Sequence, residues 1–296
     1  MVKVLVTGAQ GQLGRTLQEL APWSEGVFLS HADLDIASRT EVQKIFRTYR
    51  PDWVVNCAAY TAVDRAEVEQ EAAYRVNALG PRLLAEAAVE VGAHLLHMST
   101  DYVFGGVGNL PHREEDVPSP EGVYAKSKRA GEIEVLSTGN ALVLRTSWLY
   151  SYYDRNFFHT ILLKCLQGTP LRVIYDQVGT PTWATHLAQA IVSLVTKNRR
   201  VIGIYHYSDL GVTSWFDFAC YLRMLLGARN TILPIRSMEW KSAAPRPACS
   251  VLDSQATRDS LGVCAVSWLE GVRECFEELR KRDNGNFFRK EYLEKR

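Results

Sequence analysis

The sequence predicts an α/β protein, built as a Rossmann-type doubly wound parallel sheet with a smaller mixed α/β domain on its C-terminal side. In the first 150 residues, short apolar runs rich in β-branched residues alternate with longer stretches of helical period. This alternation indicates βαβ units, in which right-handed crossovers join parallel strands. The runs are apolar at nearly every position, which is typical of strands covered by helices on both faces.

Each element follows from this alternation. In order, strands are expected at residues 2–6, 27–29, 53–57, 94–98 and 141–145. Helices between them are expected at residues 12–20, 38–49, 67–91 and 124–136. Ser38 opens the second helix with a hydroxyl suited to capping. After Tyr150 the alternation loosens, with helices expected at 156–167, 183–196, 215–226 and 268–280 and strands at 171–175 and 204–207.

Composition and charge exclude several classes of protein. With 296 residues, 47% of them hydrophobic and 23% charged, the chain can bury a large core, so disordered and fibrous classes are excluded. Lys and Arg number 34 against 33 Asp and Glu, and no basic cluster stands out, so no nucleic-acid partner is expected. No apolar run reaches the roughly 18 residues of a membrane span, so no membrane partner is expected either.

The start of the chain and its cysteines favour a cytoplasmic location. The first strand begins almost at Met1 and no apolar leader precedes it, so no secretory signal is expected. Six cysteines are spread along the chain without a C-x-x-C motif or a spacing typical of a metal site. We therefore expect reduced thiols and no bound metal.

A glycine-rich loop separates the first strand from the first helix. Residues 7–14 have the sequence Thr-Gly-Ala-Gln-Gly-Gln-Leu-Gly. Gly8 permits the tight turn, Gly11 lets backbone N–H groups approach a pyrophosphate, and Gly14 lets the helix lie close to the strand. The helix N-terminus adds partial positive charge that favours an anion. The loop therefore predicts a dinucleotide site.

The end of the second strand indicates which dinucleotide is accepted. NAD-binding Rossmann sites usually hold an acidic residue there, which accepts from the ribose 2′-hydroxyl and repels a 2′-phosphate. This chain has Ser30 and His31 at that place, and Arg15 offers a positive charge just after the glycine-rich loop. We therefore expect NADPH as the cofactor, with NADH also accepted.

Polar residues at the end of the fourth strand and in the following helix form a candidate catalytic set. Thr100 belongs to a Ser-Thr-Asp run at the carboxyl end of the strand, where open α/β sheets bind ligands. Tyr124 and Lys128 are four residues apart and therefore share one helix face. An ammonium beside a phenol favours the phenolate and lowers the phenol pKa from its usual value of about 10. The pattern predicts proton transfer by Tyr124 beside a bound dinucleotide.

Six segments together carry a resemblance to a known family. They are residues 7–14, 56–64, 99–104, 124–128, 145–150 and 176–182. Their motifs resemble the extended short-chain dehydrogenase/reductase superfamily and, within it, the dTDP-4-dehydrorhamnose reductase family. The Arg-Thr-Ser-Trp run that begins at Arg145 and the Asp-Gln-x-Gly-x-Pro-Thr run that begins at Asp176 distinguish this family from related sugar-nucleotide enzymes. The resemblance extends from residue 2 to about residue 280.

The resemblance implies a ketone reduction, in which NADPH delivers hydride to C4 of dTDP-4-dehydro-β-L-rhamnose and the product is dTDP-β-L-rhamnose. It implies that Tyr124 donates the proton, that Lys128 positions the nicotinamide ribose and lowers the Tyr124 pKa, and that Thr100 hydrogen-bonds the reacting oxygen. Substrate contacts are implied for Thr100, Asp101 and Trp148. The implied cofactor contacts are Gly8, Gly11, Gln12, Leu13, Gly14, Asp35, Ile36, Ala58, Ala59, Tyr60, Thr61, Tyr124 and Lys128.

These assignments divide the chain. Residues 1–150, with a return at about 183–206, are expected to bind the dinucleotide; residues 151–182 and 207–282 are expected to bind the dTDP-sugar substrate; residues 283–296 form a charged tail. Arg246 is a further candidate, as a ligand of the diphosphate. Thr16 replaces a glutamate that joins a metal-bridged dimer in some relatives, so such a dimer is not indicated. A monomer and a homodimer both stay open.

Two other functions stay open as well. Some proteins of this fold are regulatory subunits that bind NADP and stabilise a partner such as methionine adenosyltransferase. Such a protein needs no complete set of Thr100, Tyr124 and Lys128, and all three are present here. A reductase or epimerase of another nucleotide-linked deoxysugar would share the hydride site, because the choice of sugar depends on loops that the motifs do not define.

Overall fold

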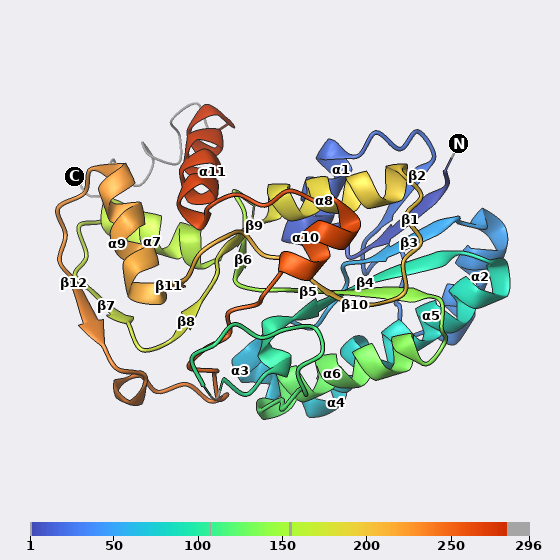
Figure 1. Ribbon diagram of the computed structural model, residues 1–296, viewed down its shortest axis with the longest axis horizontal. Coiled ribbons are helices and arrows are strands. Elements are labelled where there is room, and N and C mark those ends of the chain that lie inside the picture. Colours follow the sequence, from blue (N-terminus) through green and yellow to red (C-terminus); the bar gives the residue numbers. More distant parts are fainter. Residues whose placement is uncertain (1, 107, 154–155, 283–296) are drawn as a thin grey trace.

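The computed structural model describes residues 2–106, 108–153 and 156–282, so the expected charged tail lies outside the described residues. At its centre is a six-stranded sheet with the strand order β10-β5-β4-β3-β1-β2, and every neighbouring pair is parallel (Figure 1). The strands are β1 (Val4–Thr7), β2 (Gly26–Leu29), β3 (Trp53–Asn56), β4 (His94–Thr100), β5 (Ala141–Thr146) and β10 (Gly203–His206). The predicted α/β fold with a doubly wound parallel sheet is confirmed.

Helices cover both faces of this sheet, as Figure 1 shows. On one face lie α1 (Gln12–Leu20) and α8 (Ala184–Thr196), which pack on Val4 and Val6 of β1. On the other face lie α2 (Arg39–Tyr49), α5 (Gly80–Val91) and α6 (Gly122–Leu136). Residues of these helices form one hydrophobic core with Leu5 of β1. Successive strand side chains point to opposite faces. The apolar character of every strand position therefore follows from two covered faces, and each buried Val or Leu contributes about 2 kcal/mol.

The strand order places a topological switch between β1 and β3. From β1 the chain passes to β2 at one edge, whereas from β3 it passes through β4 and β5 toward the opposite edge. Ligands of open α/β sheets bind outside the carboxyl ends of the strands at such a switch point. The glycine-rich loop after β1 and residues 57–61 after β3 both begin at this point.

The single helix expected at residues 67–91 is interrupted. The structure has α3 (Val63–Ala66), α4 (Gln70–Tyr74), a π-helical turn η1 (Arg75–Leu79) and then α5. Pro81 lacks the N–H that would bond the carbonyl of Asn77 in an α-helix. That carbonyl faces Gly131 of α6, where an added Cβ would lie 2.0 Å from its oxygen. The proline and the close helix contact together explain the π-helical turn at residues 75–79.

A smaller lobe lies beside the sheet, at the left of Figure 1. Its core is formed by α7 (Phe157–Leu166), α9 (Trp215–Leu226), α11 (Trp268–Arg282) and the parallel pair β7 (Leu171–Ile174) and β12 (Ile232–Ile235). Two further pairs of two-residue strands join β6 (Leu149–Tyr150) to β9 (Thr182–Trp183) and β8 (Val178–Gly179) to β11 (Thr213–Ser214). Sequence reasoning missed the short strands, because a run of two residues has no measurable period. It also missed β12, whose four residues include Pro234, a residue that argues against a strand.

Other local features also differ from the expectations. Ser38 precedes α2, but its hydroxyl contacts Thr40 at 3.3 Å and does not cap a backbone N–H. The unexpected helix α10 (Gln255–Leu261) packs beside β10, and Leu261 and Val263 join the core around β1 and α8. Part of the segment expected to bind the substrate thus packs on the sheet.

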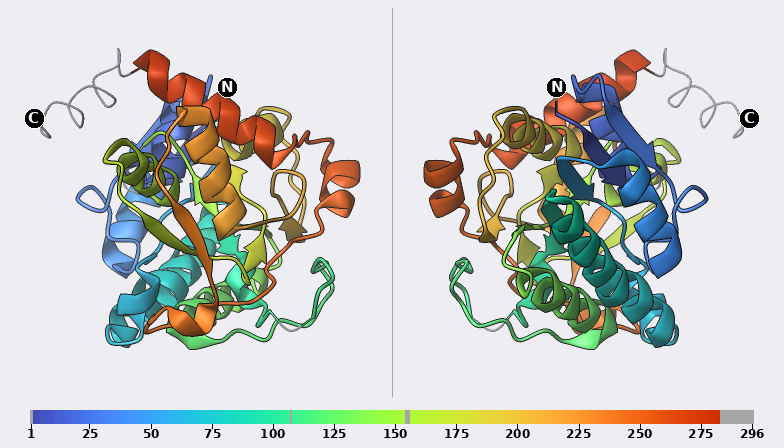
Figure 2. Two further views of the ribbon diagram at one scale, coloured as in Figure 1. Left: turned by 90° about the vertical axis from the view of Figure 1, so that its left-hand side faces the viewer. Right: turned by 90° about the vertical axis from the view of Figure 1, so that its right-hand side faces the viewer.

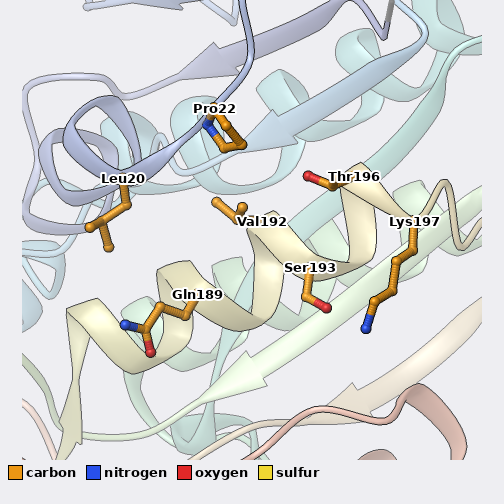
Figure 3. A pocket seen from close by; sticks show the side chains of 7 residues that line it. All are labelled: Leu20, Pro22, Gln189, Val192, Ser193, Thr196 and Lys197. Atoms are coloured by element: carbon orange, nitrogen blue, oxygen red, sulfur yellow. The ribbon is translucent and has the colours of Figure 1, made fainter.

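Three remaining features complete the outline. Between η2 (Asp101–Val103) and α6, residues 108–121 form a loop that projects from the body (Figure 2). At the ends of α1 and α8, Leu20 and Pro22 face Val192 across a surface hollow of about 340 Å³ (Figure 3). Among the helices of the described residues, none combines the length and the apolar character needed to cross a lipid bilayer.

Candidate active site

The glycine-rich loop packs tightly against the segment that directly follows β3. Gly8 has a φ of +69°, and an added Cβ would lie 2.6 Å from the backbone nitrogen of Ala58. An added Cβ at Gly14 would lie 2.3 Å from the carbonyl oxygen of Gly8. Both contacts are with backbone atoms, which cannot move aside cheaply. The predicted roles of these two glycines, a tight turn and a close helix approach, therefore have a direct steric cause.

The first turn of α1 presents backbone donors beyond this loop. Arg15 N–H makes the first bond of the helix, to the Gly11 carbonyl at 2.9 Å. The N–H groups of residues 12–14 precede that bond, and such groups at a helix start favour an anion. The Gln12 side chain takes a different role, since its Oε1 accepts from Ser151 at 2.9 Å and from Asn156 at 2.7 Å. It thereby ties the loop to the start of α7.

A cavity of about 490 Å³ opens at this point, and we call it the first cavity. It collects residues from the carboxyl ends of β1, β3, β4 and β5 and from α6. Of the expected site residues, those that line it are Gly11, Gln12, Leu13, Gly14, Ala59, Thr61, Thr100, Asp101, Tyr124, Lys128 and Trp148. Its other lining residues are Cys57, Val63, Met98, Ser99, Tyr102, Thr146, Ser147, Leu149 and Trp215.

The other expected cofactor residues lie outside this lining. Gly8 and Ala58 touch each other behind the loop, and the Ala58 N–H donates to Asn56 at 3.1 Å. Asp35 accepts from the Ala37 N–H at 3.0 Å and pairs with Arg75. Ile36 is buried against Gly80, and the Tyr60 hydroxyl donates to Glu69 at 2.5 Å.

Tyr124, Thr100 and Asp101 meet at one wall of the first cavity. Tyr124 is hydrogen-bonded to the Thr100 side chain, and the Thr100 hydroxyl donates to Asp101 Oδ1 at 3.0 Å. Asp101 is almost fully buried, and burial raises its carboxyl pKa to about 7 despite hydrogen bonds from Ser250 and Thr100. A hydroxyl, a phenol and a carboxyl of high pKa thus form a short chain of proton-carrying groups.

Lys128 lies one helical turn after Tyr124 and is buried to 3% exposure. Its ammonium donates to the carbonyl of Met98 at 2.7 Å. Burial lowers the Lys128 pKa to about 8, against the charge of Glu132, which raises it. The Cys57 thiol lies on the same cavity, and burial raises its pKa to about 12.

The expected effect of Lys128 on Tyr124 is wrong. Burial, which disfavours the phenolate, raises the Tyr124 pKa to about 12, and the neighbouring Asp101 acts in the same direction. The Lys128 ammonium is directed at the Met98 carbonyl. Desolvation therefore outweighs any attraction between the ammonium and a phenolate, and Tyr124 is held as a neutral phenol. A neutral phenol is the form that can donate a proton.

The end of β2 also differs from the expectation, because an acidic residue does lie there. The carboxylate of Asp33 accepts from the Ser30 N–H at 2.9 Å and from the Ser30 hydroxyl at 2.6 Å. These bonds lower the Asp33 pKa and keep its carboxylate engaged. The reading from sequence missed Asp33 because it is three positions after Ser30, and the chain folds back between them.

Trp148 forms the far wall of the first cavity. It has a φ of +45°, a left-handed conformation that is strained for a bulky side chain. Its ring stacks on Trp215, with ring centroids 3.4 Å apart and planes inclined by 4°. Trp215 lines both the first cavity and a second cavity of about 520 Å³. The two cavities therefore adjoin at this pair of tryptophans.

The second cavity lies in the smaller lobe and carries positive charge. Lys164, Arg172 and Arg246 line it together with the aromatic side chains of Phe157, Trp215 and Trp240. Arg246 pairs with the Asp64 carboxylate, at 2.8 and 3.1 Å from its two nitrogens, and is hydrogen-bonded to Tyr102. Since Tyr102 lines the first cavity, Arg246 also bridges the two cavities.

Sequence reasoning missed two buried residues that hold the catalytic helix. Asn77 bonds both the N–H and the carbonyl of Tyr60, at 2.8 and 3.1 Å, and the Ser127 hydroxyl at 3.0 Å. Glu132 bonds Ser99 and Arg145. The Gly-Pro pair after Asn77 was a signal for an interrupted helix, and π-turns often mark functional sites. Glu132 gave a weaker signal, namely its position four residues after Lys128.

The fold and this site define the class of protein. A parallel Rossmann sheet with a glycine-rich loop at its switch point, a Ser-Thr-Asp strand end and a Tyr-x-x-x-Lys helix is the arrangement of the extended short-chain dehydrogenase/reductase superfamily. Within that class, the chain belongs to the family described as the RmlD substrate binding domain, whose model matches residues 2–281.

Three similar proteins illustrate the family. The dTDP-4-dehydrorhamnose reductase of Streptomyces griseus is 40% identical over 283 residues, which cover 93% of each chain. The probable dTDP-4,6-dihydroxy-2-methyloxan-3-one 4-ketoreductase of Streptomyces antibioticus is 40% identical over 280 residues, covering 93% of this chain and 95% of that one. The solved structure of the Bacillus anthracis dTDP-4-dehydrorhamnose reductase, in complex with NADP, has a TM-score of 0.90 and 37% identity, covering 94% of this chain and 99% of that one.

Proposed function

We propose that the protein reduces the C4 ketone of dTDP-4-dehydro-β-L-rhamnose to dTDP-β-L-rhamnose with NADPH, the last step of dTDP-L-rhamnose biosynthesis. One observation carries this proposal: Tyr124, Thr100 and Lys128 line one cavity with the start of α1, in a chain that belongs to the RmlD family. The names of the relatives from Streptomyces griseus and Bacillus anthracis support the same substrate.

The residues of the first cavity fit a dinucleotide. The backbone N–H groups at residues 12–14 provide donors for a pyrophosphate, and the glycines leave room for close approach. Ala59 and Thr61 line the adjoining wall, and Lys128 provides the cation expected beside the nicotinamide ribose. When bound, NADPH supplies the hydride.

Tyr124 acts in this proposal as the general acid. Its pKa of about 12 keeps the phenol protonated at neutral pH, so a proton is available when the ketone oxygen gains charge. With substrate bound, the Thr100 hydroxyl turns its single proton from Asp101 Oδ1 to the same oxygen. The new C–H bond forms at C4, and the proton from Tyr124 completes the hydroxyl. Asp101, with its pKa raised to about 7, can return a proton to this phenol when it is protonated: Asp101 then donates to the Thr100 oxygen, and the Thr100 hydroxyl donates its own proton to Tyr124.

The second cavity is our candidate for the nucleotide part of the substrate. A nucleoside diphosphate needs cations for its phosphates and a flat apolar surface for its base. Lys164, Arg172 and Arg246 supply the former, and the aromatic side chains of the cavity supply the latter. The keto sugar would then lie in the first cavity beside Trp148, and the diphosphate would pass the tryptophan pair.

The expected domains and location follow from this assignment. Residues 1–150 and 183–206 would bind the cofactor, and residues 151–182 and 207–282 the substrate, with α10 packed on the sheet. We expect the protein to act in the cytoplasm, as a monomer or a homodimer. NADPH is the expected cofactor, because a relative was solved with NADP. Michaelis constants for NADPH and NADH test this choice, and a strong preference for NADH would overturn it.

Turnover with defined sugars tests the proposed reaction. dTDP-4-dehydro-6-deoxyglucose is supplied together with the epimerase that precedes this step, and loss of NADPH absorbance is followed. We expect turnover with the dTDP sugar and little with its UDP and GDP analogues. Formation of dTDP-β-L-rhamnose is checked by chromatography. NADPH binding without any turnover would instead favour the regulatory subunit considered from the sequence.

A second candidate is reduction of a different dTDP-linked deoxysugar. The relative from Streptomyces antibioticus favours it, because that protein is named a ketoreductase of another dTDP sugar at the same 40% identity. The hydride site is common to both functions, so only the substrate separates them. A panel of dTDP-4-keto sugars, compared by kcat/KM, decides between the two candidates.

A further inference from the structure

A buried ion pair lies directly beneath the catalytic helix. Both oxygens of Glu132 are occupied: Oε1 accepts from Arg145 Nε at 2.8 Å and from the Ser99 hydroxyl at 2.6 Å, and Oε2 accepts from Arg145 Nη2 at 2.8 Å. Arg129 Nη1 donates to Oε2 as well, at 2.8 Å. The side chains of Glu132 and Arg145 are both fully buried.

The position of this pair connects three parts of the active site. Glu132 lies on α6 one helical turn after Lys128, in the series that begins with Tyr124. Ser99 immediately precedes Thr100 at the end of β4. Arg145 lies near the end of β5, three residues before Trp148. The carboxylate thus joins the helix that carries the acid to the two strand ends that carry the other expected substrate contacts.

We propose that Glu132 is a positioning residue of the reductase: it fixes α6 against the ends of β4 and β5, and it places a negative charge one helical turn from Lys128. This inference rests on the proposed function, because it assigns Glu132 a task in the same site. The assignment follows from the contacts of Glu132 itself.

A charge is needed here for a reason other than stability. An ion pair withdrawn from water loses hydration that its Coulomb attraction only partly restores, and apolar residues of similar size often stabilise a core equally well. Burial opposes ionisation of Glu132, but the bonds from Arg145, Ser99 and Arg129 outweigh it and lower its pKa. The carboxylate is therefore kept charged beside a lysine whose own charge burial disfavours.

Several groups surround these two charges. Around Lys128 lie Cys57 from the segment after β3, His97 from β4 and Tyr124 from α6. Burial raises the pKa of the Cys57 thiol to about 12 and lowers that of His97, so both are neutral near pH 7. Around Glu132 lie Arg129, Arg145 and His206, whose pKa burial lowers to about 4. Glu132 is accordingly the anion among these groups that offsets the burial of Lys128.

The pH dependence of cofactor binding tests the role of Glu132. In the wild type, NADPH affinity is expected to fall as pH rises through the Lys128 pKa of about 8. Glu132→Gln keeps the shape and an oxygen for Ser99 but removes the charge. In this variant the midpoint of the fall in NADPH affinity should move to lower pH by about one unit. Glu132→Asp keeps the charge, so it should leave the fall in place while lowering kcat through a shifted helix. A purely structural residue would not separate these two variants in this way.

A second variant keeps the test decisive if Glu132→Gln fails to fold with Arg145 unpaired. Glu132→Gln combined with Arg145→Met leaves neither partner of the pair without the other, and a downward shift is expected that is smaller than in Glu132→Gln alone, because a cation is removed together with the anion. Arg129→Met is the matched control: it removes the partly exposed partner and retains the buried pair, so the wild-type pH dependence should persist. A fall at the wild-type pH in a folded variant without the Glu132 charge would overturn the proposal.

Measuring NADPH binding without sugar distinguishes a failure of the Glu132 inference from a failure of the proposed reaction. NADPH fluorescence is titrated with protein in the absence of any sugar, and thermal unfolding confirms the fold of each variant. If the wild type binds NADPH but turns over no dTDP sugar, the proposed function fails while the pH shift still tests Glu132. If the wild type turns over the sugar and Glu132→Gln shows no shift, the inference about Glu132 fails alone.

Discussion

The two cavities that meet at the Trp148 and Trp215 pair are built differently. In the first, Thr100, Asp101 and Lys128 are 7%, 2% and 3% exposed, and burial shifts the pKa values of Asp101 and Lys128. In the second, the side chain of Arg172 is 60% exposed and pairs with Glu239 at the surface. Charged groups in water interact weakly, whereas desolvated ones have altered pKa values. Chemistry should therefore depend steeply on single residues of the first cavity, and binding only moderately on those of the second.

Removing the Tyr124 hydroxyl is the most severe way to test this contrast. Tyr124→Phe keeps the ring and its edge contact with Tyr102, at 5.8 Å between centroids, but removes the proton donor. We expect kcat to fall by at least about 100-fold, the usual contribution of a positioned general acid. NADPH affinity should change little. Steady-state turnover and NADPH fluorescence titration measure the two effects.

A matched control removes a different buried phenol. Tyr207 is 1% exposed and donates to the Cys264 carbonyl at 2.9 Å, in the core around the sheet. Tyr207→Phe should lower thermal stability and leave kcat near the wild-type value. Turnover close to wild type in Tyr124→Phe would remove Tyr124 from the proposed role.

Lys128 should affect binding and rate together, and by less. Lys128→Met removes the ammonium beside the expected ribose site, so NADPH affinity should drop by about tenfold, the effect of one charge-assisted hydrogen bond. Because burial lowers the Lys128 pKa to about 8, the wild-type enzyme loses this cation as pH rises through that value. The pH dependence of NADPH affinity between pH 7 and about 9 should flatten in the variant.

The neighbouring lysine provides the control for this prediction. Lys126 is exposed on the same helix, two positions away. Lys126→Met changes the net charge by the same amount, and should leave both the affinity for NADPH and its pH dependence as in the wild type. Equal effects of the two substitutions would mean that only the overall charge matters, and would contradict the site proposed for Lys128.

Local spacing was enough to predict part of the site. Tyr124 and Lys128 are one helical turn apart, and Thr100 ends a strand, so periodicity alone could bring them to the sheet's carboxyl edge. Every strand of the sheet was found for the same reason, since buried parallel strands have continuous apolar runs.

The remaining features depend on contacts between distant segments. The Glu132 and Arg145 pair joins a helix to a strand, and the sequence shows each residue only as a charge among others. The second cavity combines α7 and β7 with residues 237–246, so no single stretch carries its pattern. Burial likewise reversed the expected pKa shift of Tyr124, because the spacing of two residues contains no information on desolvation.

Arg246 should show the smallest effect, since it acts from the second cavity. Its guanidinium is held by the Asp64 carboxylate and lies between the two cavities, where the diphosphate of the substrate is expected to pass. Arg246→Met should raise KM for the dTDP sugar by about fivefold, with kcat and NADPH affinity nearly unchanged. Asp64→Asn is the control, because it removes the negative partner of Arg246 and keeps the guanidinium. The guanidinium is then free of a competing anion, so KM for the dTDP sugar should stay equal or fall. If Arg246→Met lowered kcat by as much as Tyr124→Phe, the division of labour between the two cavities would be wrong, because a group at the diphosphate would then be acting on the ketone.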